Sequence, residues 1–119
     1  MSRRMSCAIT VDAVRARTKT ETRRHVGSWR TLTTGDRLTL IEKGMGLKKG
    51  DRQVKLADVV VTGVRVEPLS AMTEEACTAE GFPGWTVERF AAMWLSSHGY
   101  HAATDPSTVD VRVIEWRYL

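Results

Sequence analysis

Alternation of apolar and polar residues predicts β-strands for most of the regular segments of this 119-residue chain. The pattern places strands at residues 6–9, 37–42, 53–66 and 109–118. Within the third strand, Thr62 and Gly63 interrupt a run of valines and indicate a bulge or a sharp bend. The last strand changes phase between Val113 and Ile114, which indicates a bulge or a strand whose ends bury opposite faces. These features favour a sheet that curves around a small barrel.

Apolar residues at helical spacing predict three helices, near residues 11–17, 73–80 and 87–97. Each follows a hydroxyl-bearing cap, and the caps are Thr10, Ser70 or Thr73, and Thr86. Gly81 is the expected C-terminal cap of the second helix, so Glu80 lies at the carbonyl end of that helix. The helix dipole and partial burial would raise the pKa of Glu80. The sequence therefore predicts an α+β domain, a small mixed β-barrel with about three helices packed on it.

The length fits a single domain over residues 1–119 that buries a core without disulfides or metal. Cys7 and Cys77 have no paired spacing, which favours reduced thiols in an intracellular protein. The apolar segment at residues 5–9 is too short for a signal peptide, and no apolar run is long enough for a membrane span. We therefore expect a soluble, cytoplasmic protein.

The formal net charge of +4 is unevenly distributed. The first 30 residues hold eight cations and two carboxylates, a net +6, so the remainder carries about −2. This asymmetry favours an anionic partner such as a nucleotide or RNA, although basic N-terminal segments often have no such role. In a nucleic-acid-binding module the phosphate contacts would come from Arg17, Arg23, Arg24, Lys48 and Lys49. The basic loop at 44–51 lacks the Gly-Lys-Ser/Thr ending of a triphosphate site, and a hairpin connection or a flap over a pocket is expected there.

The most polar stretch runs from Arg17 to Arg24 and suits an extended strand. Alternation would then place its side chains on two faces, with Lys19, Glu21 and Arg23 on one and Thr20, Thr22 and Arg24 on the other. The Thr22 side chain could therefore contact a cation on the opposite face only if the strand bends or twists there. An exposed edge strand kept soluble by charge is the alternative interpretation.

Within this stretch and at the second helix end, the sequence offers a hydroxyl, an amine and a carboxyl group: Thr22, Lys19 and Glu80. Burial and neighbouring arginines would favour a neutral amine on Lys19, which could activate the hydroxyl. A protonated Glu80 could protonate a leaving amine. Alternatively, Lys19 is solvated and Thr22 is a simple strand former. No standard hydrolase motif is present, and His98 and His101 lack the companions of a zinc site, so we expect neither metal nor cofactor.

The same residues resemble the ASCH domains, small proteins with a PUA-like fold. The motif of that family is Gly-x-Lys-x-x-Glu-x-Arg, and Lys19, Thr22 and Arg24 occupy its Lys, Glu and Arg positions. Arg17 stands where the glycine is usual. The resemblance continues through Trp29 and the segments 35–38, 69–81 and 114–119, and the segment 42–50 looks like stand-alone bacterial and bacteriophage forms.

Threonine in the usual glutamate position is similar to small bacterial ASCH enzymes that hydrolyse N4-acetylcytidine to cytidine and acetate. This resemblance implies catalytic roles for Lys19, Thr22 and Glu80, with Arg23 and Arg24 at the substrate and Arg24 supporting a developing anion. Trp29 would stack on the base or belong to the core. The basic Arg23-Arg24-His25 and the central loop depart from those enzymes.

Three functions remain open at this point. The first is an amidohydrolase acting on an N-acylated pyrimidine nucleoside. The second, which the family also implies, is an RNA-binding module, in some members with ribonuclease activity. The third is a surface that binds a partner protein, for which the sequence gives no indication, as it gives none of the oligomeric state.

Overall fold

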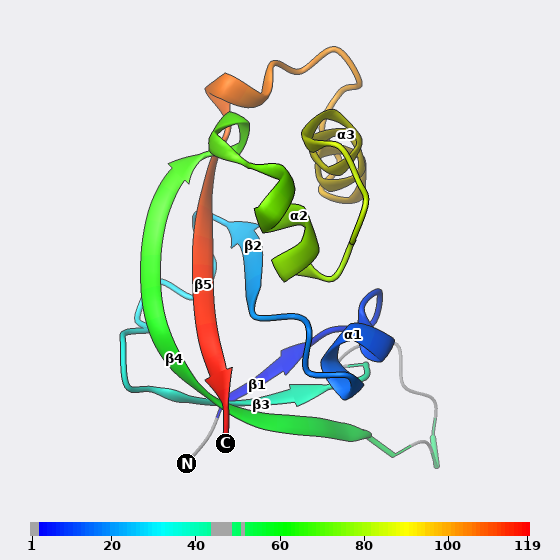
Figure 1. The fold of residues 1–119 in the computed structure, drawn as a ribbon, viewed down its shortest axis with the longest axis vertical. Coiled ribbons are helices and arrows are strands. Elements are labelled where there is room, and N and C mark those ends of the chain that lie inside the picture. The colour runs from blue at the N-terminus through cyan, green and yellow to red at the C-terminus, as the bar shows by residue number, and fades with distance from the viewer. Residues whose placement is uncertain (1–2, 44–48, 51) are drawn as a thin grey trace.

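The computed structural model describes residues 3–43, 49–50 and 52–119. Five strands form one mixed sheet in the order β1-β3-β4-β5-β2, as Figure 1 shows. Their bounds are Arg3–Ser6 for β1, Glu21–His25 for β2, Arg37–Ile41 for β3, Lys55–Pro68 for β4 and Asp110–Tyr118 for β5. β1 pairs with β3 in parallel, and the other neighbours are antiparallel.

The long strand β4 gives the sheet its curvature. Its first half pairs with β3 and its second half with β5, and the register shifts between Val61 and Gly63. This irregularity confirms the break expected at Thr62-Gly63. A Cβ atom at Gly63 would lie 3.2 Å from Oε2 of Glu115, so glycine leaves room for the Glu115 side chain across the strand pair. In Figure 1, β1 and β3 lie beside the lower part of the curved β4.

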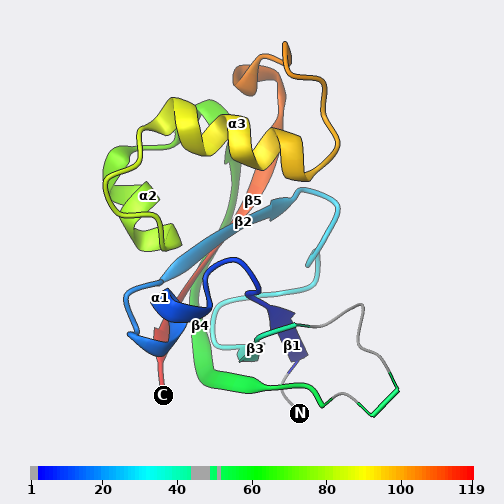
Figure 2. The same ribbon diagram turned by 90° about the vertical axis from the view of Figure 1, so that its right-hand side faces the viewer.

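The expected small mixed barrel is present as a half-barrel with three helices. β1 and β2 form the two edges of the sheet, and no pairing joins them among the described strands. Helices cover the edge at β2 instead, because Nε1 of Trp94 donates to the Arg23 carbonyl at 3.0 Å and the Thr20 amide donates to the Ala79 carbonyl at 2.8 Å. Figure 2 shows α2 and α3 above β2.

Strand β5 separates two hydrophobic clusters. Val109, Val111 and Val113 pack with residues of α2 and α3, whereas Ile114 and Trp116 pack with residues of β1, β3 and β4. The two ends of the strand therefore bury opposite faces, as the change of phase at Val113 and Ile114 predicted.

Three helices, α1 (Val11–Arg15), α2 (Glu74–Glu80) and α3 (Val87–Ser97), confirm the predicted set. The hydroxyls of Thr73 and Thr86 accept hydrogen bonds from the backbone amides of Ala76 and Arg89, as expected for N-caps. α1 ends two residues early, and Arg17 has a left-handed backbone with φ of 61°. Glycine adopts that conformation most readily, which agrees with the glycine usual at this position of the ASCH motif.

The first strand was predicted at residues 6–9, but β1 runs from Arg3 to Ser6. The Cys7 amide makes a last bond to the Ile41 carbonyl at 2.9 Å, and the Thr10 amide then turns back to the Cys7 carbonyl at 3.1 Å. Residues 7–10 consequently form a connection between β1 and α1. This connection is one wall of the pocket described next.

Candidate functional site

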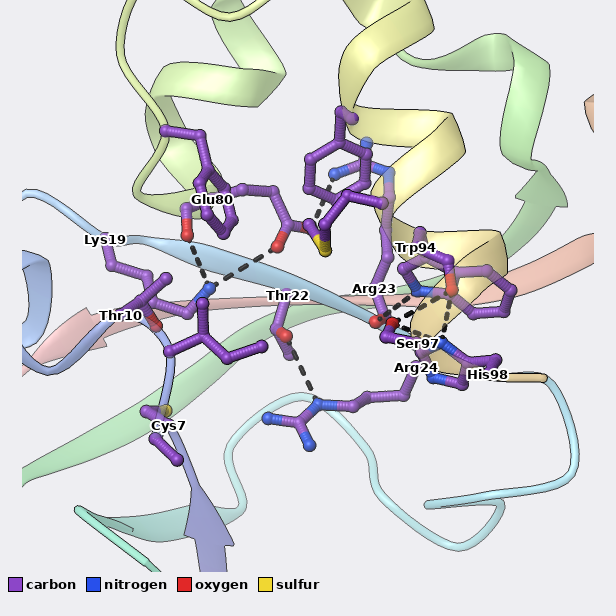
Figure 3. A pocket seen from close by; sticks show the side chains of 15 residues that line it. Cys7, Thr10, Lys19, Thr22, Arg23, Arg24, Glu80, Trp94, Ser97 and His98 are labelled. Atoms are coloured by element: carbon purple, nitrogen blue, oxygen red, sulfur yellow. Dashed lines mark hydrogen bonds and ion pairs between the residues drawn. The ribbon is translucent and has the colours of Figure 1, made fainter. Parts of the chain in front are cut away.

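One pocket lies between the β1–α1 connection, strand β2, the end of α2 and one side of α3. Its volume is about 140 Å³. Lys19, Thr22 and Glu80 all line it, so the three residues that the sequence singled out meet at one place. In Figure 3 the Thr22 side chain lies between those of Lys19 and Arg24.

Lys19 enters this pocket because it precedes the regular strand. β2 begins at Glu21, so the alternation of faces does not apply to Lys19. The Lys19 carbonyl accepts hydrogen bonds from Nε1 of Trp116 at 3.1 Å and from the Tyr118 hydroxyl at 2.6 Å. These bonds hold the backbone against the end of β5 and leave the side chain free to turn toward Glu80.

Lys19 and Glu80 form a buried pair, and each residue is 3% exposed. The Lys19 Nζ donates to the backbone carbonyl of Glu80 at 2.6 Å and lies 3.4 Å from its Oε1 atom. Glu80 is the last residue of α2, and Gly81 ends the helix with φ of 105°. The ammonium therefore lies at the negative end of a helix, where a cation is favoured.

Burial raises the pKa of the Glu80 carboxyl above its ordinary value of 4.5, although the charges of Lys19 and Arg23 act in the opposite direction. Desolvation disfavours the charged form of a carboxyl group, which explains the direction. The increase agrees with the expectation from the helix end. It favours a protonated Glu80 at a higher pH than an exposed glutamate would allow.

Arg23 was expected to contact substrate, but the structure engages its guanidinium with carboxylates. Its NH1 atom lies 2.5 Å from Glu21 Oε2 and 3.0 Å from Glu80 Oε2, and its NH2 atom lies 3.5 Å from Glu67 Oε1. Only its Nε atom is buried without a hydrogen-bond partner among the described residues. Arg23 also lines the pocket, and its main contacts hold Glu80 in position.

The hydrogen-bond partners of the Arg24 guanidinium are neutral groups instead. Its NH2 atom donates to the Ser6 carbonyl at 2.7 Å, and its Nε atom donates to the Thr22 hydroxyl at 3.2 Å. Burial lowers the pKa of Arg24, because desolvation disfavours its charge, although Cys7 and Glu80 act in the opposite direction. No hydrogen bond joins Thr22 to Lys19 or Glu80 in the described part of the chain, so a molecule in the pocket would have to connect them. Hydrogen bonds between catalytic groups are often long in a structure without substrate and become shorter when substrate binds.

The other predicted site residues lie outside this pocket. Trp29 packs against one of the two hydrophobic clusters, and the Arg3 guanidinium lies 5.1 Å from its ring. This position fits the core role that was the alternative to base stacking. Arg17 is exposed, with its guanidinium carbon 5.2 Å from the Tyr118 ring, and Lys49 is exposed as well. Lys48 and most of the basic loop at 44–51 lie outside the described residues.

Burial separates the five residues proposed for phosphate contacts. Arg23 is buried among carboxylates, and Arg24 contacts Thr22 and Ser6. Among the described members of that set, Arg17 and Lys49 are exposed. Some of the basic side chains of the N-terminal sequence therefore point into the protein and not toward solvent.

Several pocket residues were not identified from the sequence. Trp94 and His98 stack with ring centroids 3.7 Å apart, and Nδ1 of His98 lies 2.7 Å from the Trp94 carbonyl. Phe82 and Met93 add apolar surface, and Ile9 is a strongly exposed apolar residue at the pocket. The spacing of Trp94 and His98 by one helical turn was a usable signal, although helical spacing of aromatic residues usually indicates a core.

Within residues 3–43, 49–50 and 52–119, no three His, Cys, Asp or Glu side chains form a group that could hold a metal ion. No helix described in the structure is long and apolar enough to cross a membrane.

Comparison of the sequence with family models gives no match, and comparison with curated proteins gives none. Solved structures do share the fold. Protein EF3133 from Enterococcus faecalis V583, of family DUF984, has a TM-score of 0.63 at 17% identity, over 93% of this chain and 70% of that one. The hypothetical protein PH0355 has a TM-score of 0.64 at 18% identity, over 100% of both chains.

An ASCH domain from Lactobacillus crispatus JV V101 is also similar. Its TM-score is 0.60 at 9% identity, and the match covers 92% of this chain and 70% of that domain. Identities this low carry information about the fold and not about the chemistry. The fold expected from the motif around Lys19 is thus confirmed, and the chain has the α+β fold of an ASCH domain.

Proposed function

We propose that this protein is an amidohydrolase that removes the acyl group from an N-acylated pyrimidine nucleoside such as N4-acetylcytidine. The observation that carries the proposal is the meeting of Lys19, Thr22 and Glu80 in one pocket, from positions up to 61 residues apart in the sequence. An amine, a hydroxyl and a carboxyl group together supply the base, nucleophile and acid that amide hydrolysis needs.

The size of the pocket limits what part of a substrate enters it. A cavity of about 150 Å³ holds one benzene molecule. The volume of about 140 Å³ therefore fits an acyl amide with part of one pyrimidine ring. In this arrangement the amide lies at Thr22, Phe82 and Met93 offer apolar surface to the ring, and the sugar stays outside.

The reaction begins at the Thr22 hydroxyl, which attacks the acyl carbonyl carbon or holds the water that does. A neutral Lys19 accepts the proton of the attacking group. Arg24 donates to the oxyanion that develops on the carbonyl oxygen, because its charge is close to Thr22. Glu80 gives its proton to the departing amine. If Thr22 is acylated, water then releases the acid, so that one amide and one water give one amine and one carboxylic acid.

This scheme needs a neutral Lys19 and a protonated Glu80 at the same time. Written as an ion pair, the contact has the proton on Lys19 and the negative charge on Glu80. Moving one proton across the 3.4 Å contact converts that pair into the reactive form without changing its total charge. Burial raises the pKa of Glu80, which lowers the free energy needed for the transfer.

The test is incubation of purified protein with N4-acetylcytidine, followed by chromatography for cytidine and an assay for acetate. We expect both products in equal amounts. Lys19→Ala should reduce kcat/KM by about 10²–10⁴-fold, the usual contribution of general acid–base catalysis. Lys49→Ala, which removes an exposed lysine outside the pocket, is the matched control and should leave the rate unchanged. Release of no cytidine above the blank would refute the proposal.

A further inference from the structure

Arg24 forms no ion pair with a carboxylate among the described residues. Its hydrogen-bond partners are the Ser6 carbonyl and the Thr22 hydroxyl, which are both neutral. The other two cations of the pocket are paired, since Lys19 contacts Glu80 and Arg23 contacts three carboxylates. A cation removed from water without an opposite charge is unfavourable. A bound anion would relieve that cost.

The neighbours of Arg24 have donors to offer such an anion. The Thr22 hydroxyl accepts from Arg24, so its own proton is available to donate. The Lys19 ammonium has three donors, and two of its contacts are to the carbonyl and the carboxylate of Glu80. Thr22 lies between Lys19 and Arg24 in Figure 3. Three side chains thus direct donors to one small space.

We propose that this pocket binds a small monocarboxylate, held by Arg24 and Thr22 with Lys19 beside them. The single cation without an ion-pair partner, Arg24, matches a monoanion better than a phosphate dianion. The planar guanidinium suits the two oxygens of a carboxylate. The volume of about 140 Å³ admits an anion as small as acetate.

This inference rests on the proposed function for the identity of the natural anion, which would be the acid released from the acyl group. It has a kinetic consequence. Acetate occupies the place of the acyl group in the substrate, so it should inhibit hydrolysis of N4-acetylcytidine competitively. Binding of the anion itself needs no substrate and can be measured separately.

The experiment is a titration of the full chain with sodium acetate, followed by two-dimensional NMR of the backbone amides. Sodium chloride at the same ionic strength and acetamide, a neutral molecule of the same shape, are the controls. We expect saturable shifts at Thr22 and Arg24 with acetate and no saturable shift with the controls. Equal responses to acetate and acetamide, or to acetate and chloride, would overturn the proposal. Inorganic phosphate that binds more tightly than acetate would overturn it as well.

Two variants locate the site. Arg24→Gln should weaken acetate binding by at least about tenfold, because a hydrogen bond to a charged group contributes about 1.5–3 kcal/mol. Thr22→Val keeps the side-chain shape, and we expect a loss of about two- to tenfold from one neutral hydrogen bond. Arg30→Gln, at an exposed arginine outside the pocket, should have no effect. If both pocket variants bind acetate as the unchanged protein does, the site is elsewhere and the proposal fails.

The two proposals fail in different ways. Saturable acetate binding without hydrolysis of N4-acetylcytidine would support the carboxylate site and refute the proposed reaction. Hydrolysis without acetate binding or inhibition would support the reaction and refute the carboxylate site.

Discussion

Arg23 and Arg24 are adjacent in the sequence, and their surroundings are opposite. Arg23 lies among Glu21, Glu67 and Glu80, whereas Arg24 contacts only neutral groups among the described residues. Alternation along β2 explains the difference, because successive side chains of a strand point to opposite faces. Arg23 therefore positions the carboxyl group of Glu80, and Arg24 is the cation that we propose contacts a ligand.

Replacing Arg23 tests its structural role. Arg23→Gln leaves buried carboxylates without their cation, and we expect a loss of about 3–5 kcal/mol in the free energy of unfolding. Arg65→Gln is the matched control, because Arg65 pairs with Glu67 and Glu115 at the surface. Exposed pairs contribute about 0–1 kcal/mol. Urea denaturation of both variants measures the difference, and similar small losses would show that the Arg23 network does not stabilise the fold.

The raised pKa of Glu80 predicts how stability depends on pH. The folded protein holds this proton more tightly than the unfolded chain does, because burial raises the pKa above 4.5. The contribution of Glu80 to stability is thus greatest below the unfolded pKa and declines as pH rises through the folded pKa. Compared with Glu80→Gln, the unchanged protein should lose stability as pH rises above about 4.5, the ordinary pKa of the carboxyl group.

Denaturation of the two proteins across that pH range checks the sign. Glu75→Gln, which removes an exposed carboxylate from the first turn of the same helix, should show no such change relative to the unchanged protein. If the stability of the unchanged protein relative to the Glu80→Gln variant increases as pH rises, the direction assigned to the pKa of Glu80 is contradicted.

At the scale of elements, the pocket depends on the point where α2 meets the β1–α1 connection and α1. Gly81 ends α2 in a left-handed conformation, and a Cβ atom there would lie 3.0 Å from Cγ2 of Thr10 and 3.1 Å from the Ala13 Cβ. The same helix end presents the Glu80 carbonyl to Lys19. The close approach of these elements therefore sets the position of the Lys19–Glu80 pair.

Two glycine variants separate this close approach from backbone strain. Gly84 is also left-handed, but a Cβ atom there would meet no atom within 4 Å. Gly84→Ala should cost about 1–2 kcal/mol through backbone strain alone. Gly81→Ala should cost more and should also reduce hydrolysis, because it displaces the end of α2. Equal losses of stability in thermal unfolding, with activity intact in both variants, would show that the contact is unimportant.

At the scale of the whole molecule, the excess positive charge of the N-terminal region is partly removed from the surface, because Arg23 is buried and the half-buried Arg24 lines the pocket. We therefore expect only weak, non-specific RNA binding, with a Kd of about 10⁻⁴–10⁻⁶ M that weakens as salt increases. Titration of a labelled oligoribonucleotide at two salt concentrations measures this affinity. Tight binding that persists at high salt would favour the RNA-binding function instead.

The sequence predicted much of this molecule because its signals were local. The caps Thr73 and Thr86, the break near Gly63 and the alternating valines of β5 each report on the chain within one element. The position of β1 was predicted three residues too late, since the strand runs from Arg3 to Ser6 where it pairs in parallel with β3. No local pattern encodes that partner.

The site was predicted in part for the same reason. The motif identified Lys19 and Thr22, and the helix end drew attention to Glu80. The separate surroundings of Arg23 and Arg24 depend on Glu67 and Ser6, which are distant in the sequence. The position of Trp94 and His98 at the pocket could be predicted only with knowledge of which side of α3 faces β2.

The most direct test of the central claim is a double-mutant comparison of kcat/KM for N4-acetylcytidine. The proteins compared are the unchanged protein, Lys19→Ala, Glu80→Gln and the double variant, with Glu75→Gln as control. Residues that act as one catalytic unit give strongly non-additive losses. We therefore expect the double variant to be about as slow as the slower single variant. Losses that multiply in the double variant, or single variants that retain full activity, would contradict the account.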